Sequence, residues 1–177
     1  MVGNKTNNIL TFFYNTEEMF NDVSLLSSYM TKNLATESGS LMDEFIISDD
    51  EREIYNECVK QALPNIYETL LKLTTGVEDA FADSFNVTDK NEDALNRDKG
   101  TYIELNIKNN KQYNKNVLAL VDATIRDCIK YATLAEFYSI CINADLQGIV
   151  QGKYASSMIQ LNQRLFQLKK QIVYSHL

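Results

Sequence analysis

The feature that most constrains this chain is the stretch from residue 117 to residue 144, which contains neither proline nor glycine. Apolar residues recur along it at helical spacing, and they follow two lines instead of one. The first line is Leu118, Val121, Ile125, Cys128, Ala132 and Ala135, and the second is Val117, Leu120, Leu134, Tyr138 and Cys141. Because a surface helix needs only one apolar stripe, the pattern predicts a helix that is central in the domain or buried at a subunit contact.

A second helical pattern follows a turn that we place at residues 147–152, where Gly148 and Gly152 stand. Its apolar positions are Tyr154, Met158, Leu161, Leu165, Leu168 and Ile172. Arg164, Lys169 and Lys170 lie toward its C-terminal end, where cations interact favourably with the helix dipole. Helices joined by a short loop pack antiparallel, so we expect a C-terminal helical hairpin over residues 117–174.

The N-terminal half predicts two further helical segments. Asn15 can cap a helix over residues 16–36, with Glu17 in its first turn. Ser48-Asp49-Asp50-Glu51 fits a capping box and begins a helical segment over residues 48–75. Pro64, the only proline, should kink this segment or restart it.

Residues 78–108 predict an acidic loop followed by a strand. The loop is polar up to Gly100, and Ile103, Leu105 and Ile107 then alternate with polar residues, as in a β-strand. Phe85 and Val87 could pair with this strand as a hairpin. The fold class we expect is therefore mainly α: a single domain, residues 1–177, built as a helical bundle with the long C-terminal hairpin and a short β-strand or β-hairpin insertion.

Charge and composition limit the possible partners. The net charge of −7 repels nucleic acid and anionic membranes on average. No stretch approaches the roughly 20 apolar residues of a membrane helix, and the N-terminus lacks the apolar region of a signal peptide. Cys58, Cys128 and Cys141 fall within apolar helical patterns and are expected to be buried, reduced thiols. We expect a protein that is made in a cytoplasm and does not contact a membrane.

The residues that usually carry catalysis do not form a recognisable site. The only histidine, His176, stands at the end of the chain, and the cysteines lack the paired spacing of a zinc site. Asp89, Asn91 and Asp93 imitate a calcium loop without its required glycine and glutamate. We therefore expect no enzyme, no metal site and no cofactor. Glu136 lies in an apolar helix and is expected to pair with Arg164 or Lys153 across the hairpin.

The order of these parts resembles a known class of protein. The relevant segments are Ser48-Asp49-Asp50-Glu51-Arg52-Glu53, Thr101-Tyr102-Ile103-Glu104-Leu105-Asn106-Ile107, Leu118-Ala119-Leu120-Val121-Asp122, Ala135-Glu136-Phe137-Tyr138 and Lys153-Tyr154-Ala155. Over residues 48 to 172 the chain resembles small helical virion proteins of tailed phages and prophages of the crAss-like or Bacteroides type, namely head-to-tail connector or neck-ring proteins. The helix at residues 16–34 lies outside this likeness.

This resemblance implies a ring of identical subunits, of twelvefold symmetry, that stacks under the portal protein in the neck or tail of the virion. The ring would contact other neck or tail proteins and would line or support the channel through which genomic DNA passes without sequence recognition. The doubly apolar helix and the strand suit a contact between subunits. The candidate interface residues are Tyr102, Ile103, Leu105, Ile107, Leu120, Leu134 and Tyr138.

Two other functions stay open. An intracellular helical adaptor could bind a different protein through the same apolar surface and would have no catalytic activity. A magnesium-dependent nucleotide hydrolase would need acidic residues on two helices. Asp50, Glu53 and Glu57 could line the first helix, but no second acidic pair at helical spacing follows in the hairpin.

Overall fold

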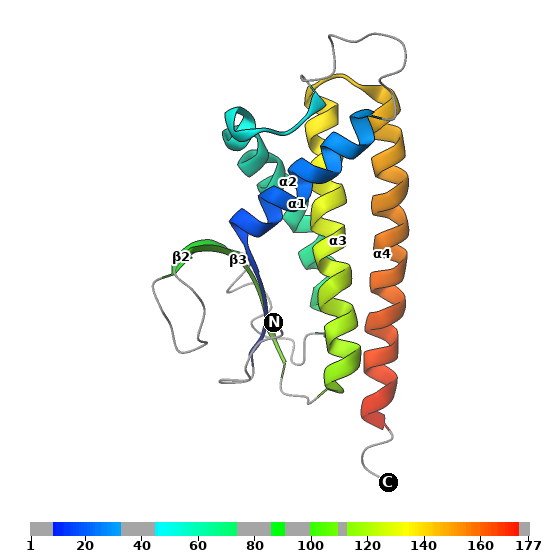
Figure 1. The fold of residues 1–177 in the computed structure, drawn as a ribbon. Helices are drawn as coiled ribbons and strands as arrows, with labels where there is room; N and C mark the ends of the chain where they lie inside the picture. The colour runs from blue at the N-terminus through cyan, green and yellow to red at the C-terminus, as the bar shows by residue number, and fades with distance from the viewer. Residues whose placement is uncertain (1–8, 33–44, 74–85, 91–99, 110–112, 174–177) are drawn as a thin grey trace.

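The computed structural model describes residues 9–32, 45–73, 86–90, 100–109 and 113–173 (Figure 1). Within these residues the chain forms four α-helices and a three-stranded antiparallel sheet, which confirms the expected fold class. His176, Phe85 and, within the acidic loop predicted at residues 78–100, residues 78–85 and 91–99 lie outside the described residues.

The C-terminal hairpin is formed by α3 (Lys115–Ile140) and α4 (Ala144–Val173), which lie side by side along their length (Figure 1). The turn between them falls at residues 141–143. The Asn143 N–H donates to the Tyr138 carbonyl at 3.0 Å, and the Asn143 side chain accepts from the Leu146 N–H at 3.0 Å. Asn143 therefore both closes α3 and caps α4.

The predicted position of this turn was wrong. Gly148 and Gly152 lie inside α4, and the turn is made earlier in the chain by Ile142, whose φ is 55°. A helix tolerates an interior glycine at a cost of about 1 kcal/mol. Burial of Leu146 and Val150, both at most 1% exposed, outweighs that cost here because each buried aliphatic side chain contributes roughly 1.5–3 kcal/mol.

Helix α3 occupies the centre of the domain. It packs against α4 on one side and against α2 and α1 on others, and side chains from both of its predicted apolar lines are buried. Its first turn is capped by Asn114, whose side chain accepts from the Asn116 N–H at 2.9 Å. Of the two environments left open by the sequence, the central position in the domain explains the apolar pattern.

Two shorter helices cover α3. Helix α1 (Thr16–Lys32) crosses it, as Figure 1 shows, and α2 (Arg52–Leu70) lies along another side. A 3-10 turn (Asp49–Glu51) precedes α2, and the capping box between Ser48 and Glu51 is present as predicted. The helix runs through the exposed Pro64 and ends in a second 3-10 turn (Leu71–Leu73).

The sheet has the strand order β1-β3-β2, with β1 (Ile9–Asn15), β2 (Asn86–Lys90) and β3 (Gly100–Lys108). The predicted pairing of Val87 with the strand is confirmed, and its partner there is Ile103, whereas β1 was not anticipated. Phe12 of β1 pairs with Leu105, so β3 is central and has a partner on both edges within the chain. A strand from a neighbouring copy is therefore not needed to complete β3.

Candidate functional site

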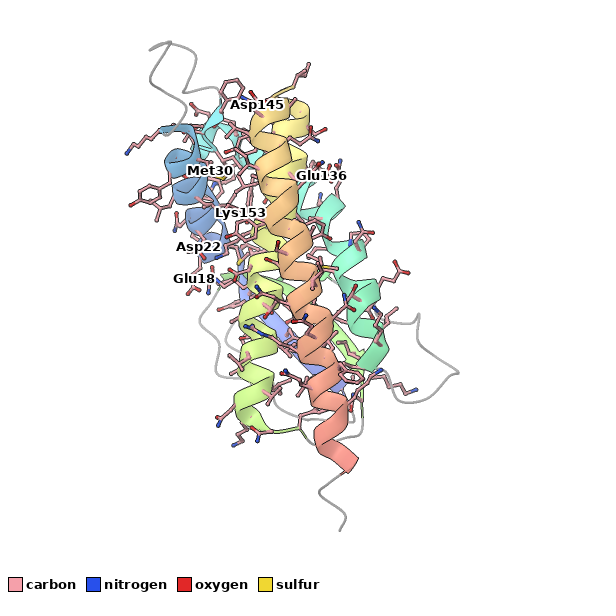
Figure 2. The ribbon with its side chains drawn as sticks, turned by 90° about the vertical axis from the view of Figure 1, so that its right-hand side faces the viewer. Glu18, Asp22, Met30, Glu136, Asp145 and Lys153 are labelled. Atoms are coloured by element: carbon pink, nitrogen blue, oxygen red, sulfur yellow. The ribbon has the colours of Figure 1, made fainter. Side chains whose placement is uncertain are left out.

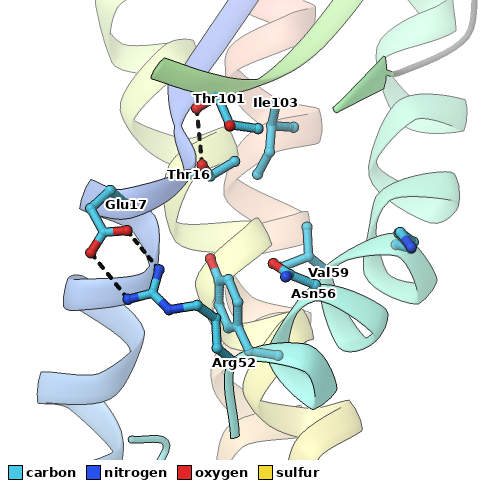
Figure 3. Close-up of a pocket in the computed structure, with 9 residues that line it drawn as sticks. Thr16, Glu17, Arg52, Asn56, Val59, Thr101 and Ile103 are labelled. Carbon is cyan, nitrogen blue, oxygen red and sulfur yellow. Dashed lines mark hydrogen bonds and ion pairs between the residues drawn. The ribbon is translucent and has the colours of Figure 1, made fainter. Parts of the chain in front are cut away.

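A pocket of about 330 Å³ lies where the first turns of α1 and α2 meet β3 (Figure 3). Its polar side chains come from all three elements, and Val59 and Ile103 form its apolar part. The lining residues are Thr16, Glu17, Arg52, Tyr55, Asn56, Val59, Lys60, Thr101 and Ile103.

Arg52 is the most heavily bonded side chain of this pocket. Its guanidinium donates to both oxygens of Glu17, at 2.6 and 3.2 Å, and to Asp49 at 2.7 Å. It also lies over the Phe20 ring, 4.0 Å from the ring centroid. The hydrogen bonds from Arg52 lower the pKa of Glu17 below its usual value. Both charges are therefore used in holding α1 against α2.

The other pocket residues offer little to a reaction. Lys60 donates to Glu57 at 2.6 Å, and Thr16 donates to the Thr101 carbonyl at 2.9 Å (Figure 3). The Tyr55 hydroxyl is buried and has no hydrogen-bond partner among the described residues, and burial raises the pKa of Tyr55 above its ordinary value of 10. A nucleophile needs an adjacent base or a lowered pKa, and this pocket provides neither. It can accommodate a small polar molecule. The side chains that line it hold α1, α2 and β3 together.

The acidic residues of α2 do not form a metal site with the rest of the described chain. No group of three or more His, Cys, Asp or Glu side chains that could hold a metal ion occurs in the described ranges. Glu57 is bound to Lys60, and Glu53 is exposed. The arrangement that a magnesium-dependent hydrolase would need is thus not present in the part of the chain that the structure describes.

The predicted interface residues require a correction, because the structure places most of them inside the chain's own core. Six are at most 6% exposed, namely Tyr102, Ile103, Leu105, Ile107, Leu134 and Tyr138. The sheet and the helices of the same chain cover them, so burial within the chain already accounts for their apolar character. Leu120 is the exception, with 49% of its surface exposed.

The expected partners of Glu136 were also wrong. Arg164 donates to the Leu120 carbonyl at 2.5 Å and to the Thr124 hydroxyl, so it joins α4 to the start of α3. Lys153 lies over the Tyr131 ring, 5.8 Å from its centroid. Figure 2 shows Glu136 on the α2 side of the hairpin and Lys153 on the α1 side. Glu136 is partly exposed, so water can solvate its carboxylate without a cation.

The surface that sequence reasoning missed is the outer face of α4, which we define as Gly148, Ile149, Gly152, Ala155, Ser156 and Ile159. All six residues are exposed, with Ile149 at 49% and Ile159 at 60%. This face lies opposite the buried line of Leu146, Val150 and Leu161. The spacing of Ile149, Gly152, Ser156 and Ile159 by three and four residues was a visible signal. It was overlooked because the glycines were assigned to a turn.

Two further groups of large apolar side chains are exposed. Leu25 and Tyr29, one turn apart on α1, are 59% and 61% exposed. At the tip of the hairpin, Ile140 is 53% and Ile142 is 91% exposed. Ile142 has the left-handed backbone conformation that β-branched residues rarely adopt. With Ile54 on α2 and Leu120 on α3, 40% and 49% exposed, the exposed apolar surface is therefore spread over all four helices and the hairpin tip.

Comparison of the chain with protein-family models, with curated proteins and with solved structures finds no match. None of the helices in the described residues is both long and apolar enough to span a membrane.

Proposed function

We propose that this chain is a virion structural protein of the head-to-tail connector or neck-ring type. In this proposal, identical copies assemble side by side into a ring beneath the portal, and the ring lines or supports the channel for the exiting DNA. The resemblance of residues 48 to 172 to such proteins supplies the class. The outer face of α4 supplies the physical support.

The outer face of α4 suits a helix-to-helix contact between copies. Ile149 and Ile159 expose large apolar surfaces, while Gly148, Gly152, Ala155 and Ser156 are small enough for another helix to approach closely. A Cβ atom added at Gly148 or Gly152 would meet nothing within 4 Å, so packing within the chain does not require either glycine. Each glycine costs about 1 kcal/mol relative to alanine. A helix of a neighbouring subunit that packs closely on this face would explain why glycine stands at both positions.

The fold also suits a rigid structural component of an assembly. The long hairpin is held by a continuous core, and the charged side chains of the described pocket are already paired, Arg52 with Glu17 and Lys60 with the neighbouring Glu57. The net charge of −7 disfavours a tight grip on DNA that passes through a channel. These features support a structural part over a catalyst.

The experiment that tests the proposal measures the mass and shape of the purified full-length chain. Light scattering over a wide range of concentrations and negative-stain electron microscopy should show closed rings. Ile159→Asp should abolish them, whereas Leu25→Asp, a matched change at an equally exposed position on α1, should leave them intact. A wild-type chain that stays monomeric at every concentration, and is absent from phage particles whose genome encodes it, would sink the proposal.

A helical adaptor is the second candidate, and Ile142 favours it. An isoleucine that is 91% exposed on a strained turn is costly unless a partner covers it. An adaptor predicts one defined heteromeric partner, lost on Ile142→Gly, and no closed ring of identical copies. A ring whose assembly is unaffected by Ile142→Gly would decide against this candidate.

A further inference from the structure

The pocket between α1, α2 and β3 contains polar groups that the fold itself does not use. One face of α2 supplies five of the lining residues, at spacings of three, four, seven and eight positions, and α1 and β3 supply the rest. The five residues of α2 are Arg52, Tyr55, Asn56, Val59 and Lys60. All of the lining belongs to one chain, so what the pocket binds does not depend on the assembly of copies.

The Tyr55 hydroxyl is a buried group that lacks a partner. Tyr55 is only 2% exposed, and its hydroxyl forms no hydrogen bond within the described residues. The ring is held in place by an edge-to-face contact with Phe20, at 5.1 Å between ring centroids. Burial raises the pKa of Tyr55, so the hydroxyl keeps its proton and can donate. A bound molecule that supplies the missing hydrogen bond would remove an unfavourable feature of the fold.

Asn56 provides a second set of unused polar groups. Its side chain is exposed and forms no hydrogen bond in the part of the chain that the structure describes. A side-chain amide carries two N–H donors and an acceptor oxygen. Figure 3 shows Asn56 beside Val59, across the pocket from the pair of Glu17 and Arg52. The polar groups therefore surround the pocket and include both donors and acceptors.

The charges around the pocket favour a neutral ligand. Arg52 is bonded to Glu17 and Asp49, and Lys60 is bonded to Glu57. An anion would have to compete with these carboxylates for the two cations. A cation would meet Arg52 and Lys60, because Asp49 and Glu57 do not line the pocket. A charged molecule would thus lose its hydration without gaining an unpaired opposite charge.

The size and the apolar part of the pocket suit a single sugar ring. A cavity of about 330 Å³ has the room of on the order of ten water molecules. Val59 and Ile103 offer an apolar surface to C–H groups. A sugar ring combines C–H groups on its faces with hydroxyls around its rim, and each hydroxyl both donates and accepts. A flat heterocycle carries its polar groups along its edges only, which suits polar groups on several sides less well.

We propose that this pocket binds one neutral sugar ring. Asn56 and the Tyr55 hydroxyl bond to the ring hydroxyls, and Val59 and Ile103 contact its C–H groups. The pocket binds the sugar without transforming it, since it contains no activated nucleophile. A free monosaccharide and a sugar unit within a glycan share this chemistry, so both sources are compared in the test.

Binding to the full-length chain is measured by saturation-transfer NMR and by calorimetric titration. The neutral probes are D-glucose, D-galactose, D-mannose and their methyl glycosides, and the charged comparison compounds are inorganic phosphate and putrescine. We expect saturable binding of at least one hexose and of neither charged compound. Equal binding of a hexose and its methyl glycoside would assign the site to a sugar unit of a glycan, whereas binding of the free hexose alone would assign it to a monosaccharide.

Three variants test the assignment of the residues. Tyr55→Phe breaks no hydrogen bond within the described chain, so it should leave the unfolding midpoint unchanged or raise it while weakening sugar binding roughly tenfold. Asn56→Leu should abolish binding. Asn65→Leu is the matched control, because Asn65 is also exposed on α2 and nine positions further along it, which places it on the opposite face of the helix.

Three results would overturn the proposal: no saturable binding of any neutral probe, tighter binding of phosphate or putrescine than of the sugars, or unchanged sugar affinity in Asn56→Leu. Light scattering of the same samples keeps this inference separate from the ring function. Sugar binding by a chain that stays monomeric would support the pocket and count against the ring. Rings that bind none of the probes would do the reverse.

Discussion

Arg52 donates two hydrogen bonds to the carboxylate of Glu17, at 2.6 and 3.2 Å, across thirty-five positions of the sequence. The pair joins the first turn of α2 to the first turn of α1. The guanidinium also covers the Phe20 ring, which makes an edge-to-face contact with Tyr55 at 5.1 Å between ring centroids. One side chain therefore combines an ion pair with aromatic stacking at the entrance of the pocket.

Arg52→Lys should lower the stability of the fold even though it keeps the charge. Lysine cannot form the two-pronged bond to Glu17 or stack on Phe20, and the stacking alone contributes about 0.5–1 kcal/mol. Urea denaturation at pH 7 measures the loss. Because Arg52 lowers the folded pKa of Glu17, the stability from this pair is present above the usual pKa of 4.5 and is lost as the pH falls through the folded pKa. A deficit of the variant that is equally large at pH 3 would contradict this account.

Tyr14→Phe should destabilise the fold by about 1–3 kcal/mol. The Tyr14 hydroxyl donates to the Asp122 carboxylate at 2.9 Å and so links β1 to α3, at a position only 5% exposed. The substitution removes the hydroxyl and leaves Asp122 without this donor. Tyr29→Phe, at a position 61% exposed, is the matched control and should change the unfolding midpoint little. Equal effects of the two substitutions would show that the bond to Asp122 contributes nothing.

The helices were predictable because their signals are local. The capping box at Ser48 and the apolar lines of α3 depend on residues within a few turns of one another. Strand β1 was missed because Ile9 to Tyr14 is apolar almost throughout, with no clear alternation. Its burial alternates only because Leu10, Phe12 and Tyr14 face the helices, and that depends on pairing with β3 about ninety positions away.

The interface residues were misplaced for a related reason. A sequence shows that Ile103 or Tyr138 is apolar, and only the fold shows whether the same chain covers it. The turn at Ile142 was unpredictable because a β-branched residue opposes a left-handed conformation. The sequence therefore placed the turn at Gly148 and Gly152. With these glycines assigned to a turn, the outer face of α4 could not be recognised as part of a helix.

Cys58 and Cys128 should resist alkylation in the folded protein. Burial raises the pKa of Cys58 to about 11 and that of Cys128 to about 12, whereas Cys141 is only partly buried. Iodoacetamide at pH 8, followed by mass spectrometry, should modify Cys141 first. Both buried thiols stay protonated in the fold, so their contribution to stability is constant below the unfolded pKa of about 9 and falls as the pH rises from there toward 12. Modification of all three at one rate would contradict the buried assignment.

Ile142→Gly should stabilise the isolated chain by about 0.5–1 kcal/mol. The left-handed conformation costs an L-residue about 1–2 kcal/mol, and glycine adopts it freely but loses more backbone entropy on folding. Ile142→Val keeps the strain and serves as the control. Thermal unfolding of the three proteins measures the difference. A lower midpoint for the glycine variant than for wild type would mean that the exposed side chain makes a stabilising contact.

Gly152→Ala should affect folding and assembly in opposite directions. In the isolated chain the added methyl group meets nothing within 4 Å, and alanine should stabilise α4 by about 1 kcal/mol. If another copy packs on the outer face, the same methyl group separates the two helices and weakens the ring. Urea denaturation below the assembly concentration measures the first effect, and light scattering above it measures the second. Gln151→Ala, at the exposed position before Gly152, controls for helix propensity alone. Stronger assembly of the Gly152→Ala variant would mean that no helix approaches α4 closely at this point.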